Sequence, residues 1–354
     1  MPSFEVKTPQ QTYHAIVERG ILGRVADYLP AKAGKIFVVT TEDVWRHQGQ
    51  SLQTGRPHDT LYLPGGENRK RLAPVEAMAE EMVARGADRS SIVIAFGGGI
   101  VNDMAGFLAA IFMRGIPVLQ IPTTLLGQVD AAIGGKTGVN LVAGKNLIGS
   151  FHQPLAVLID PAALDTLPER EYRAGLFEVI KYGVIRSPGL FQLLSDRYKD
   201  VAARVPGVVD EIIAESVRIK AEVVSADERE GGIRKILNFG HTVGHALEAE
   251  TAYSRFLHGE AVAFGMQAAV HLAELTRRLA PDDAERIRHA IRQYGPIPSL
   301  SGIPADNLVG RLVADKKTIQ GKVHFVLPRK VGEVTVVSGV DENLVRSAVE
   351  AALA

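Results

Sequence analysis

Two histidines, His241 and His245, stand four residues apart in LNFGHTVGHALEAE (237–250), a segment with the apolar periodicity of a helix. At that spacing both side chains lie on one helix face, about one turn apart, as two ligands of one metal ion would. Two capped or core histidines explain the spacing equally well. Protease chemistry is disfavoured, because Thr242 stands where the H-E-x-x-H motif requires a glutamate.

Further metal donors occur in the neighbouring segments. His258 begins the apolar segment LHGEAVAFGM, and Glu178 lies inside GLFEVIKYG. Cysteine is absent from the chain, so a metal here would be held by histidine and carboxylate. Two histidines and one carboxylate around an open position are typical of a catalytic zinc site rather than a structural one.

Several lysines stand where a cation is unexpected. Lys220 falls within the apolar stripe of Ile213, Val217 and Val224, where an ammonium must either reach solvent along its stem or meet an anion. Lys181 follows Glu178 by three residues, which is the spacing of an ordinary helical salt bridge. These two lysines therefore have both a structural and a substrate-binding interpretation.

Other cations are Arg234 and the pair Lys316–Lys317, all of which solvent could stabilise. The chain has 40 basic and 40 acidic residues, so no overall basic charge recruits nucleic acid, and we expect no such partner. Local cations beside metal donors favour an anionic small molecule that bears phosphate and carboxylate.

A strand, a triple glycine and a helix follow one another in SIVIAFGGGIVNDMAGFLAA, with the glycines at Gly97–Gly99. Glycine lets the backbone approach a phosphate, and a helix N-terminus offers free N–H groups. An ordinary tight turn is the alternative, but Asp103 one turn into the helix favours a nucleotide. The G-x-G-x-x-G fingerprint fails here, and GGKTG (134–138) is no Walker A loop, because Asp130 stands at its first glycine.

The elements that must position these residues change character along the 354-residue chain. Up to about residue 167, short apolar runs alternate with helical stretches near 70–85 and 101–113, which predicts a parallel sheet covered by helices. The predicted strands are KIFVVT (35–40), SIVIAF (91–96), IPVLQI (116–121) and AVLID (156–160).

After this point helical periodicity dominates, interrupted by a β pair at 322–328 and 333–338. We expect helices near 167–185, 207–229, 238–250, 259–279, 282–294 and 341–353. The predicted domains are therefore residues 1–167, an α/β domain, and residues 168–354, a mainly helical domain. The N-terminus lacks the pattern of a signal peptide, and no apolar run is long enough for a membrane helix. We expect a soluble, cytoplasmic enzyme without a membrane partner.

The chain resembles the 3-dehydroquinate synthases from about residue 64 to 330. The resemblance rests on motifs in the family's order, specific only in combination: GGGIVNDMAGFLAAIFMRGI, IPTTLLGQVDAAIGGKTGVN, GKNLIGSFHQP, TLPEREYRAGLFEVIKYG, NFGHTVGHALE, LHGEAVAFGM and DKK. It implies an N-terminal NAD-binding α/β domain and a mainly α-helical C-terminal metal-binding domain, with the site in the cleft between them.

The resemblance also implies residue roles. Glu178, His241 and His258 would hold Zn²⁺ or Co²⁺, and His245 would lie beside the substrate. The implied NAD contacts are Gly65, Gly66, Glu67, Asn68, Lys70, Gly99, Asp103, Thr123, Thr124, Lys136, Lys145 and Thr166. The implied substrate contacts are Asp130, Lys136, Asn146, Lys181, Lys220, Arg234, Asn238, His245 and one of Lys316 or Lys317.

The implied reaction converts 3-deoxy-D-arabino-heptulosonate 7-phosphate to 3-dehydroquinate and phosphate in the shikimate pathway. It proceeds by transient oxidation with NAD, phosphate elimination, reduction and intramolecular aldol closure. A homodimer is expected, as is common for such enzymes. The alternatives are a sister sugar-phosphate cyclase, a metal-dependent polyol dehydrogenase and a catalytically inactive binding homologue.

Overall fold

The computed structural model describes residues 2–316 and 323–354; the side chains of residues 313–316 are not described. Its contacts divide the chain into two compact units. The first contains residues 1–172 and 209–228, and the second contains residues 173–208 and 229–354. The predicted boundary at residue 167 stays a prediction. Residues 209–228 lie in the helical half of the sequence, but they belong to the first unit.

The first unit is built on a seven-stranded sheet with the order β1-β2-β9-β6-β5-β3-β4. All neighbours pair in parallel except β1 and β2, which are antiparallel. The strands are β1 Ser3–Lys7, β2 Thr12–Val17, β3 Ile36–Thr40, β4 His58–Tyr62, β5 Ile92–Gly97, β6 Val118–Pro122 and β9 Ala156–Ile159. The predicted α/β class is therefore confirmed, and the sheet extends beyond the four strands expected from the sequence.

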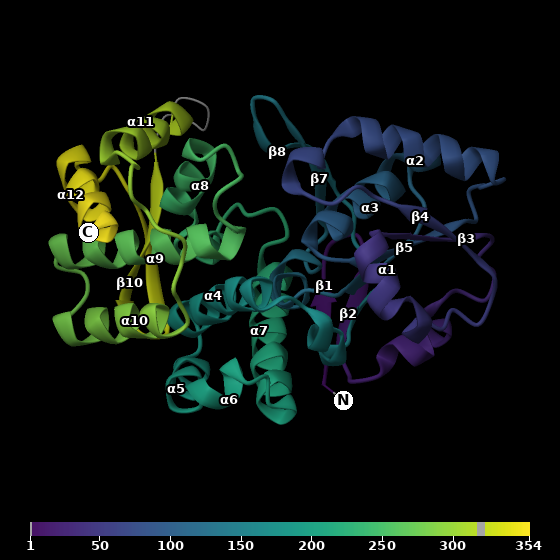
Figure 1. The fold of residues 1–354 in the computed structure, drawn as a ribbon, viewed down its shortest axis with the longest axis horizontal. Helices are drawn as coiled ribbons and strands as arrows, with labels where there is room; N and C mark the ends of the chain where they lie inside the picture. Colours follow the sequence, from purple (N-terminus) through teal and green to yellow (C-terminus); the bar gives the residue numbers. More distant parts are fainter. Residues whose placement is uncertain (1, 317–322) are drawn as a thin grey trace. The chain divides into compact units, whose positions relative to one another are not determined.

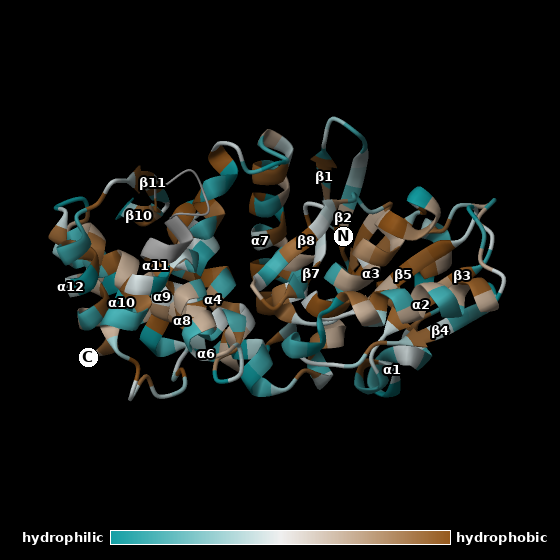
Figure 2. Ribbon diagram, turned by 90° about the horizontal axis from the view of Figure 1, so that it is seen from above, coloured by the Kyte–Doolittle hydropathy of each residue, from teal (hydrophilic) through white to brown (hydrophobic). Residues whose placement is uncertain are grey.

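Helices cover this sheet, and an antiparallel hairpin adds a second, small sheet (Figure 1). The hairpin strands are β7 Lys136–Leu141 and β8 Gly144–Phe151. The helices are α1 Glu42–Gln48, α2 Leu72–Ala84, α3 Gly99–Ile111 and α7 Pro206–Ala226, of which the last begins in the second unit. Figure 2 shows apolar residues on β5 and α3, where Phe96 and Leu108 are fully buried.

The second unit is mainly helical, as predicted. Its helices are α4 Glu169–Ile185, α5 Pro188–Asp196, α6 Tyr198–Ala202, α8 His241–Glu250, α9 His258–Leu275, α10 Pro281–Gln293, α11 Ala305–Lys316 and α12 Glu342–Leu353. The predicted β pair is present as β10 His324–Lys330 and β11 Glu333–Ser338. Among the described residues, no helix is long and apolar enough to cross a membrane.

The buried helix α9 lies at the centre of this unit, against α8, α10, α12 and β10 (Figure 1). Glycines allow its close packing. A methyl group at Gly265 would overlap the carbonyl oxygen of Gly240, and one at Gly259 would overlap that of Ala174 on α4. These backbone approaches bring the start of α8 against α9, and the start of α9 against α4.

Candidate functional site

Three helices of the second unit bring the predicted metal donors together. His241 and His258 are the first residues of α8 and α9, and Glu178 lies in the middle of α4. The Oε1 atom of Glu178 lies 3.7 Å from Nε2 of each histidine. Tetrahedral zinc with bonds of about 2.0–2.1 Å separates its ligand atoms by roughly 3.4 Å. Each histidine nitrogen therefore lies at about the distance from the Glu178 oxygen that a shared metal ion requires.

Both histidines have their other ring nitrogen engaged. Nδ1 of His241 lies 3.2 Å from the carbonyl oxygen of Phe239, and Nδ1 of His258 lies 3.4 Å from Oε2 of Glu248. Each acceptor favours the tautomer with the proton on Nδ1, which leaves Nε2 as the donor atom for a metal. Glu248 was not predicted from the sequence, although its position seven residues after His241 places it on the same face of α8.

His245 offers a second possible ligand set. Its ring centroid lies 5.4 Å from that of His241 and 5.8 Å from that of His258. Donor atoms of the three histidines lie within 4.8 Å of one another. The geometry thus accommodates either the three histidines or the predicted set of Glu178, His241 and His258.

The environment of Glu178 fits a cation. Its side chain is completely buried, and Oε1 accepts no hydrogen bond from a described donor. Oε2 is ion-paired with Lys181, which is itself buried. A buried carboxylate needs compensating charge, so a metal beside Oε1 would complete what Lys181 supplies at Oε2.

Two further predicted substrate residues of this unit, Arg234 and Asn238, lie in the turn that precedes α8. Arg234 is 1% exposed, in a 3-10 turn that spans Ile233–Asn238. Asn238 donates to Glu230, a residue with φ of 62° that was not predicted from the sequence. Of the DKK pair, Lys316 is the last residue of α11, without a described side chain, and Lys317 lies outside the described residues.

The triple glycine of the first unit forms the predicted strand-to-helix turn, since β5 ends at Gly97 and α3 begins at Gly99. The amide of Thr123 donates to the carbonyl of Gly97 at 2.9 Å, and a methyl group at Gly98 would lie 2.9 Å from Thr124. In the sheet, β5 lies between β6 and β3. The connection after β5 leads to β6 on one side, whereas the connection after β3 leads to β4 in the opposite direction. Ligands of open α/β sheets bind at the carboxyl ends of strands where the order reverses in this way.

Lys70 connects the predicted cofactor residues. Its ammonium contacts Asp103 on α3 and donates to Oδ1 of Asn146 on β8 at 2.6 Å. Lys70 is 3% exposed, and burial raises the pKa of the Asp103 carboxyl, while the charge of Lys70 opposes the rise. Asn146, predicted as a substrate residue, therefore contacts a lysine predicted for NAD.

The GGENRK turn is fixed through Asn140 on β7. The side-chain amide nitrogen of Asn140 donates to Oε1 of Glu67 at 2.8 Å. The side-chain oxygen of Asn140, Oδ1, accepts from the main-chain N–H of Asn146 at 2.9 Å. Lys145 Nζ lies 3.4 Å from the same Glu67 oxygen. Gly66 has φ of 100° and directly follows Gly65. It precedes the 3-10 turn Glu67–Arg69, which contains Asn68. Thr166 accepts a hydrogen bond from Gln48 and is exposed.

A second pair in this unit joins residues 90 positions apart. Lys220 on α7 donates to Oδ1 of Asp130 at 2.6 Å, and the lysine side chain is 7% exposed. Asp130 lies in a π-helical turn, Gly127–Ala131, of the kind often found at functional sites. Lys136 is the exposed first residue of β7. Lys220 thus meets an anion rather than only extending to solvent.

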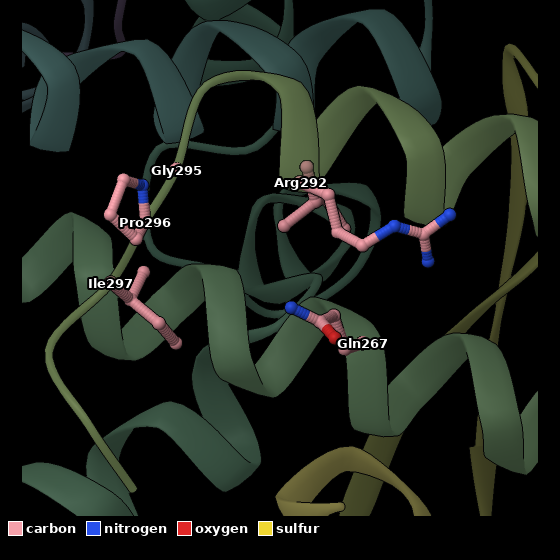
Figure 3. Close-up of a pocket in the computed structure, with 6 residues that line it drawn as sticks. Gln267, Arg292, Gly295, Pro296 and Ile297 are labelled. Atoms are coloured by element: carbon pink, nitrogen blue, oxygen red, sulfur yellow. The ribbon is translucent and has the colours of Figure 1, made fainter.

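A pocket in the second unit is lined by Gln267, Ile291, Arg292, Gly295, Pro296 and Ile297 (Figure 3). It contains no carboxylate, histidine or hydroxyl. Since it offers neither a metal donor nor a general base, we assign it no part in the chemistry.

The fold and these residues define an α/β enzyme with a helical second unit that bears metal donors. Sequence comparison is more specific. Family models described as 3-dehydroquinate synthase N-terminal and C-terminal match residues 60–174 and 175–318. A 3-dehydroquinate synthase of Solibacter usitatus (strain Ellin6076) is 70% identical, over 100% of both chains. The chain belongs to the 3-dehydroquinate synthase family.

Solved structures of two other synthases share the fold. The 2-epi-5-epi-valiolone synthase of Streptomyces hygroscopicus subsp. jinggangensis 5008, with NAD+ and Zn2+ bound, is 28% identical over 98% of both chains, with a TM-score of 0.89. A 2-deoxy-scyllo-inosose synthase complexed with carbaglucose-6-phosphate, NAD+ and Co2+ is 25% identical over 99% of both chains, with a TM-score of 0.87.

Proposed function

We propose that this protein converts 3-deoxy-D-arabino-heptulosonate 7-phosphate into 3-dehydroquinate and phosphate, with NAD as a recycled cofactor and Zn²⁺ or Co²⁺ as its metal. The observation that carries the proposal is Glu178 Oε1 at 3.7 Å from Nε2 of both His241 and His258. It occurs in a chain whose family is named for this reaction.

When bound, NAD supplies a hydride acceptor and the metal supplies Lewis acidity at a substrate hydroxyl. Glu178, His241 and His258 are the proposed metal ligands. Lys181 and Arg234, both buried, are the proposed anion contacts of this unit. Buried cations stabilise phosphate and carboxylate more strongly than exposed ones, and they hold the substrate in one orientation.

His245 is the proposed proton-transfer group, since an imidazole can exchange a proton near neutral pH. In the first unit, the proposed NAD contacts are Lys70 and Asp103, which pair with each other, and Thr123 and Thr124, which follow β6. The remaining cofactor candidates are Gly65, Gly66, Glu67, Asn68, Gly99, Lys136, Lys145 and Thr166. The remaining substrate candidates are Asp130, Asn146, Lys220, Asn238 and one of Lys316 or Lys317.

The choice of substrate separates this proposal from a sister cyclase. The solved valiolone and inosose synthases share the fold at 25–28% identity, whereas the 70% relative carries the dehydroquinate name over the full length. A carboxylate on the substrate gives a purpose to Arg234 and Asn238, which a sugar phosphate without a carboxylate would not use.

Phosphate release from the heptulosonate phosphate, with NAD⁺ below the enzyme concentration, tests the proposal. We expect many turnovers per NAD⁺, loss of activity with a chelator and recovery with Zn²⁺ or Co²⁺. A polyol dehydrogenase would instead accumulate NADH in proportion to product. Release only from sedoheptulose 7-phosphate or glucose 6-phosphate would reassign the substrate, and release from none would reject the cyclase function.

Location in the cytoplasm and assembly as a homodimer remain predictions from the sequence. The balanced charge of the chain does not oppose a dimer. Sedimentation of the purified protein would establish the oligomeric state.

A further inference from the structure

We propose that Glu248 is a positioning residue that fixes His258 as a metal ligand. The inference rests on the proposed function, because it requires that His258 bind the metal through Nε2. Its basis is the contact of Glu248 Oε2 with Nδ1 of His258 at 3.4 Å, a residue and a contact outside the set inferred from the sequence.

The two proposed histidine ligands are anchored by different means. His241 has the main-chain carbonyl of Phe239 at Nδ1, and Phe239 directly follows the 3-10 turn Ile233–Asn238. His258 has a side chain there instead. A main-chain acceptor is present whatever the residue type. The acceptor of His258 is present only if residue 248 has a side-chain oxygen that can reach Nδ1.

His258 has greater need of an anchor than His241. Its side chain is 27% exposed, compared with 11% for His241. Each histidine is the first residue of its helix, so neither ring has a preceding turn of that helix against it, and the greater exposure of His258 is the difference. Without an acceptor at Nδ1, the imidazole could rotate or take the other tautomer, and Nε2 would no longer be held toward Glu178.

Glu248 is itself held in place. Its side chain is 2% exposed. Its carbonyl oxygen accepts from the amide of Tyr253 at 2.8 Å and from the hydroxyl of Thr251 at 3.3 Å. A buried carboxylate is costly unless it is hydrogen-bonded or paired, and the imidazole N–H meets part of that need. A carboxylate behind a metal-bound histidine also makes the ring a stronger donor to the metal.

The experiment measures metal affinity rather than turnover. Metal-free wild-type protein and the variants Glu248→Gln and Glu248→Ala are titrated with Co²⁺ against a competing chelator, and the visible absorption of bound Co²⁺ is recorded. Gln keeps the shape and one acceptor oxygen but removes the charge, and Ala removes both. Glu274→Gln is the matched control, because it lies at the far end of α9, where Glu274 pairs with Arg288.

Loss of a group behind a metal-bound histidine typically weakens metal affinity about 10- to 100-fold. We expect a loss in that range for Glu248→Ala, a smaller loss for Glu248→Gln, and wild-type affinity for Glu274→Gln. The Co²⁺ spectrum of the Glu248 variants should change as well. In His258→Ala protein, replacing Glu248 should cause no further loss of affinity, since its effect acts through that ring.

Urea unfolding of each metal-free variant identifies a merely structural role. If the Glu248 variants lose stability but keep wild-type Co²⁺ affinity and spectrum, Glu248 supports only the fold and the inference is overturned. The same holds if the loss persists undiminished in His258→Ala protein. If wild-type protein binds no Co²⁺, or if His258→Ala binds it as wild type does, the proposed metal set fails instead.

Discussion

Glu178 is the residue on which the choice between the two ligand sets turns. It is fully buried and lies 3.7 Å from both proposed histidine ligands. We expect Glu178→Gln to lower zinc affinity by at least about 100-fold, because a neutral amide replaces an anionic ligand. His245→Gln should retain zinc and lose turnover. The measurement is zinc content by atomic absorption after gel filtration in buffer with a weak chelator.

Lys181→Met is the control for charge in this comparison, because it removes the ion-pair partner of Glu178 without removing a proposed ligand. It should still bind zinc. Zinc retained by Glu178→Gln but lost from His245→Gln would establish the three-histidine set in place of the proposed one.

Lys220 is paired with Asp130, so its replacement affects both the fold and the proposed substrate contact. We expect Lys220→Met to lower kcat by about 100-fold or more, the usual cost of removing one charge-stabilising group. The free energy of unfolding should fall by only about 1–3 kcal/mol, because Asp130 retains 20% exposure to water.

Steady-state kinetics and urea unfolding measure these two effects separately. The variant Asp130→Asn serves for comparison, since it breaks the same pair and keeps the lysine. If Lys220→Met turns over at a rate near that of wild type, Lys220 is a structural cation and has no place at the substrate.

Between elements, the close packing of α9 against α8 gives a sharp prediction. A methyl group at Gly265 would overlap the carbonyl oxygen of Gly240, which is rigid main chain. Gly265→Ala should therefore destabilise the protein by about 1–3 kcal/mol, as overpacking does. It should also weaken zinc binding, because α8 and α9 carry His241 and His258. Chemical denaturation and Co²⁺ titration measure the two effects.

Gly310 on α11 provides the matched control, because nothing lies within 4 Å of where its methyl group would be. Gly310→Ala should be neutral or stabilising by up to about 1 kcal/mol, as expected for a helix interior. Equal stability of the Gly265 and Gly310 variants would mean that the two helices can separate without cost.

Helix α9 also contains a histidine, His271, whose protonation makes the stability depend on pH. Burial lowers the pKa of His271, Arg288 lowers it further, and Glu274 acts in the opposite direction. A histidine whose pKa is lower in the folded state favours folding above its unfolded pKa of about 6.5. That contribution is lost as the pH falls below this value and through the folded pKa.

His271→Gln should therefore lose less stability than wild type between pH 8 and pH 5. Urea unfolding of the two proteins at a series of pH values tests this, and every other titrating group is common to both. A stability difference that stays constant with pH would mean that His271 titrates alike in the folded and unfolded states.

Elements with a regular apolar period were predictable from the sequence, and elements without one were not. The helices α3, α8 and α9 and the strands β3, β5 and β6 lie where the pattern placed them. The hairpin strand β8 was missed, since its burial does not alternate along the strand. Contacts such as Asp130–Lys220 and Glu67–Asn140 join residues 73 to 90 positions apart. No periodicity records such pairs, and Asn140 escaped prediction for that reason. Glu230 and Glu248 lie only 8 and 10 positions from Asn238 and His258, but in different elements, which a helical period does not connect.

The whole molecule divides into two units, and each unit contains the proposed binding residues of a different ligand. The proposed NAD residues lie in the first unit and the proposed metal ligands in the second. The single tryptophan, Trp45, lies on α1 in the first unit, so its fluorescence reports the unfolding of that unit. The helices that dominate the second unit contribute strongly to circular dichroism at 222 nm.

We therefore expect NAD⁺ to raise the urea midpoint observed by Trp45 fluorescence, and chelation of zinc to lower the midpoint observed by circular dichroism. A ligand that binds only the folded state, at about 100 times its Kd, stabilises by about 2.7 kcal/mol. Glu178→Gln protein should show the NAD⁺ effect but no chelator effect. Zinc that stabilises the Trp45 transition and leaves the dichroism transition unchanged would place the metal in the first unit, against the arrangement of Glu178, His241 and His258.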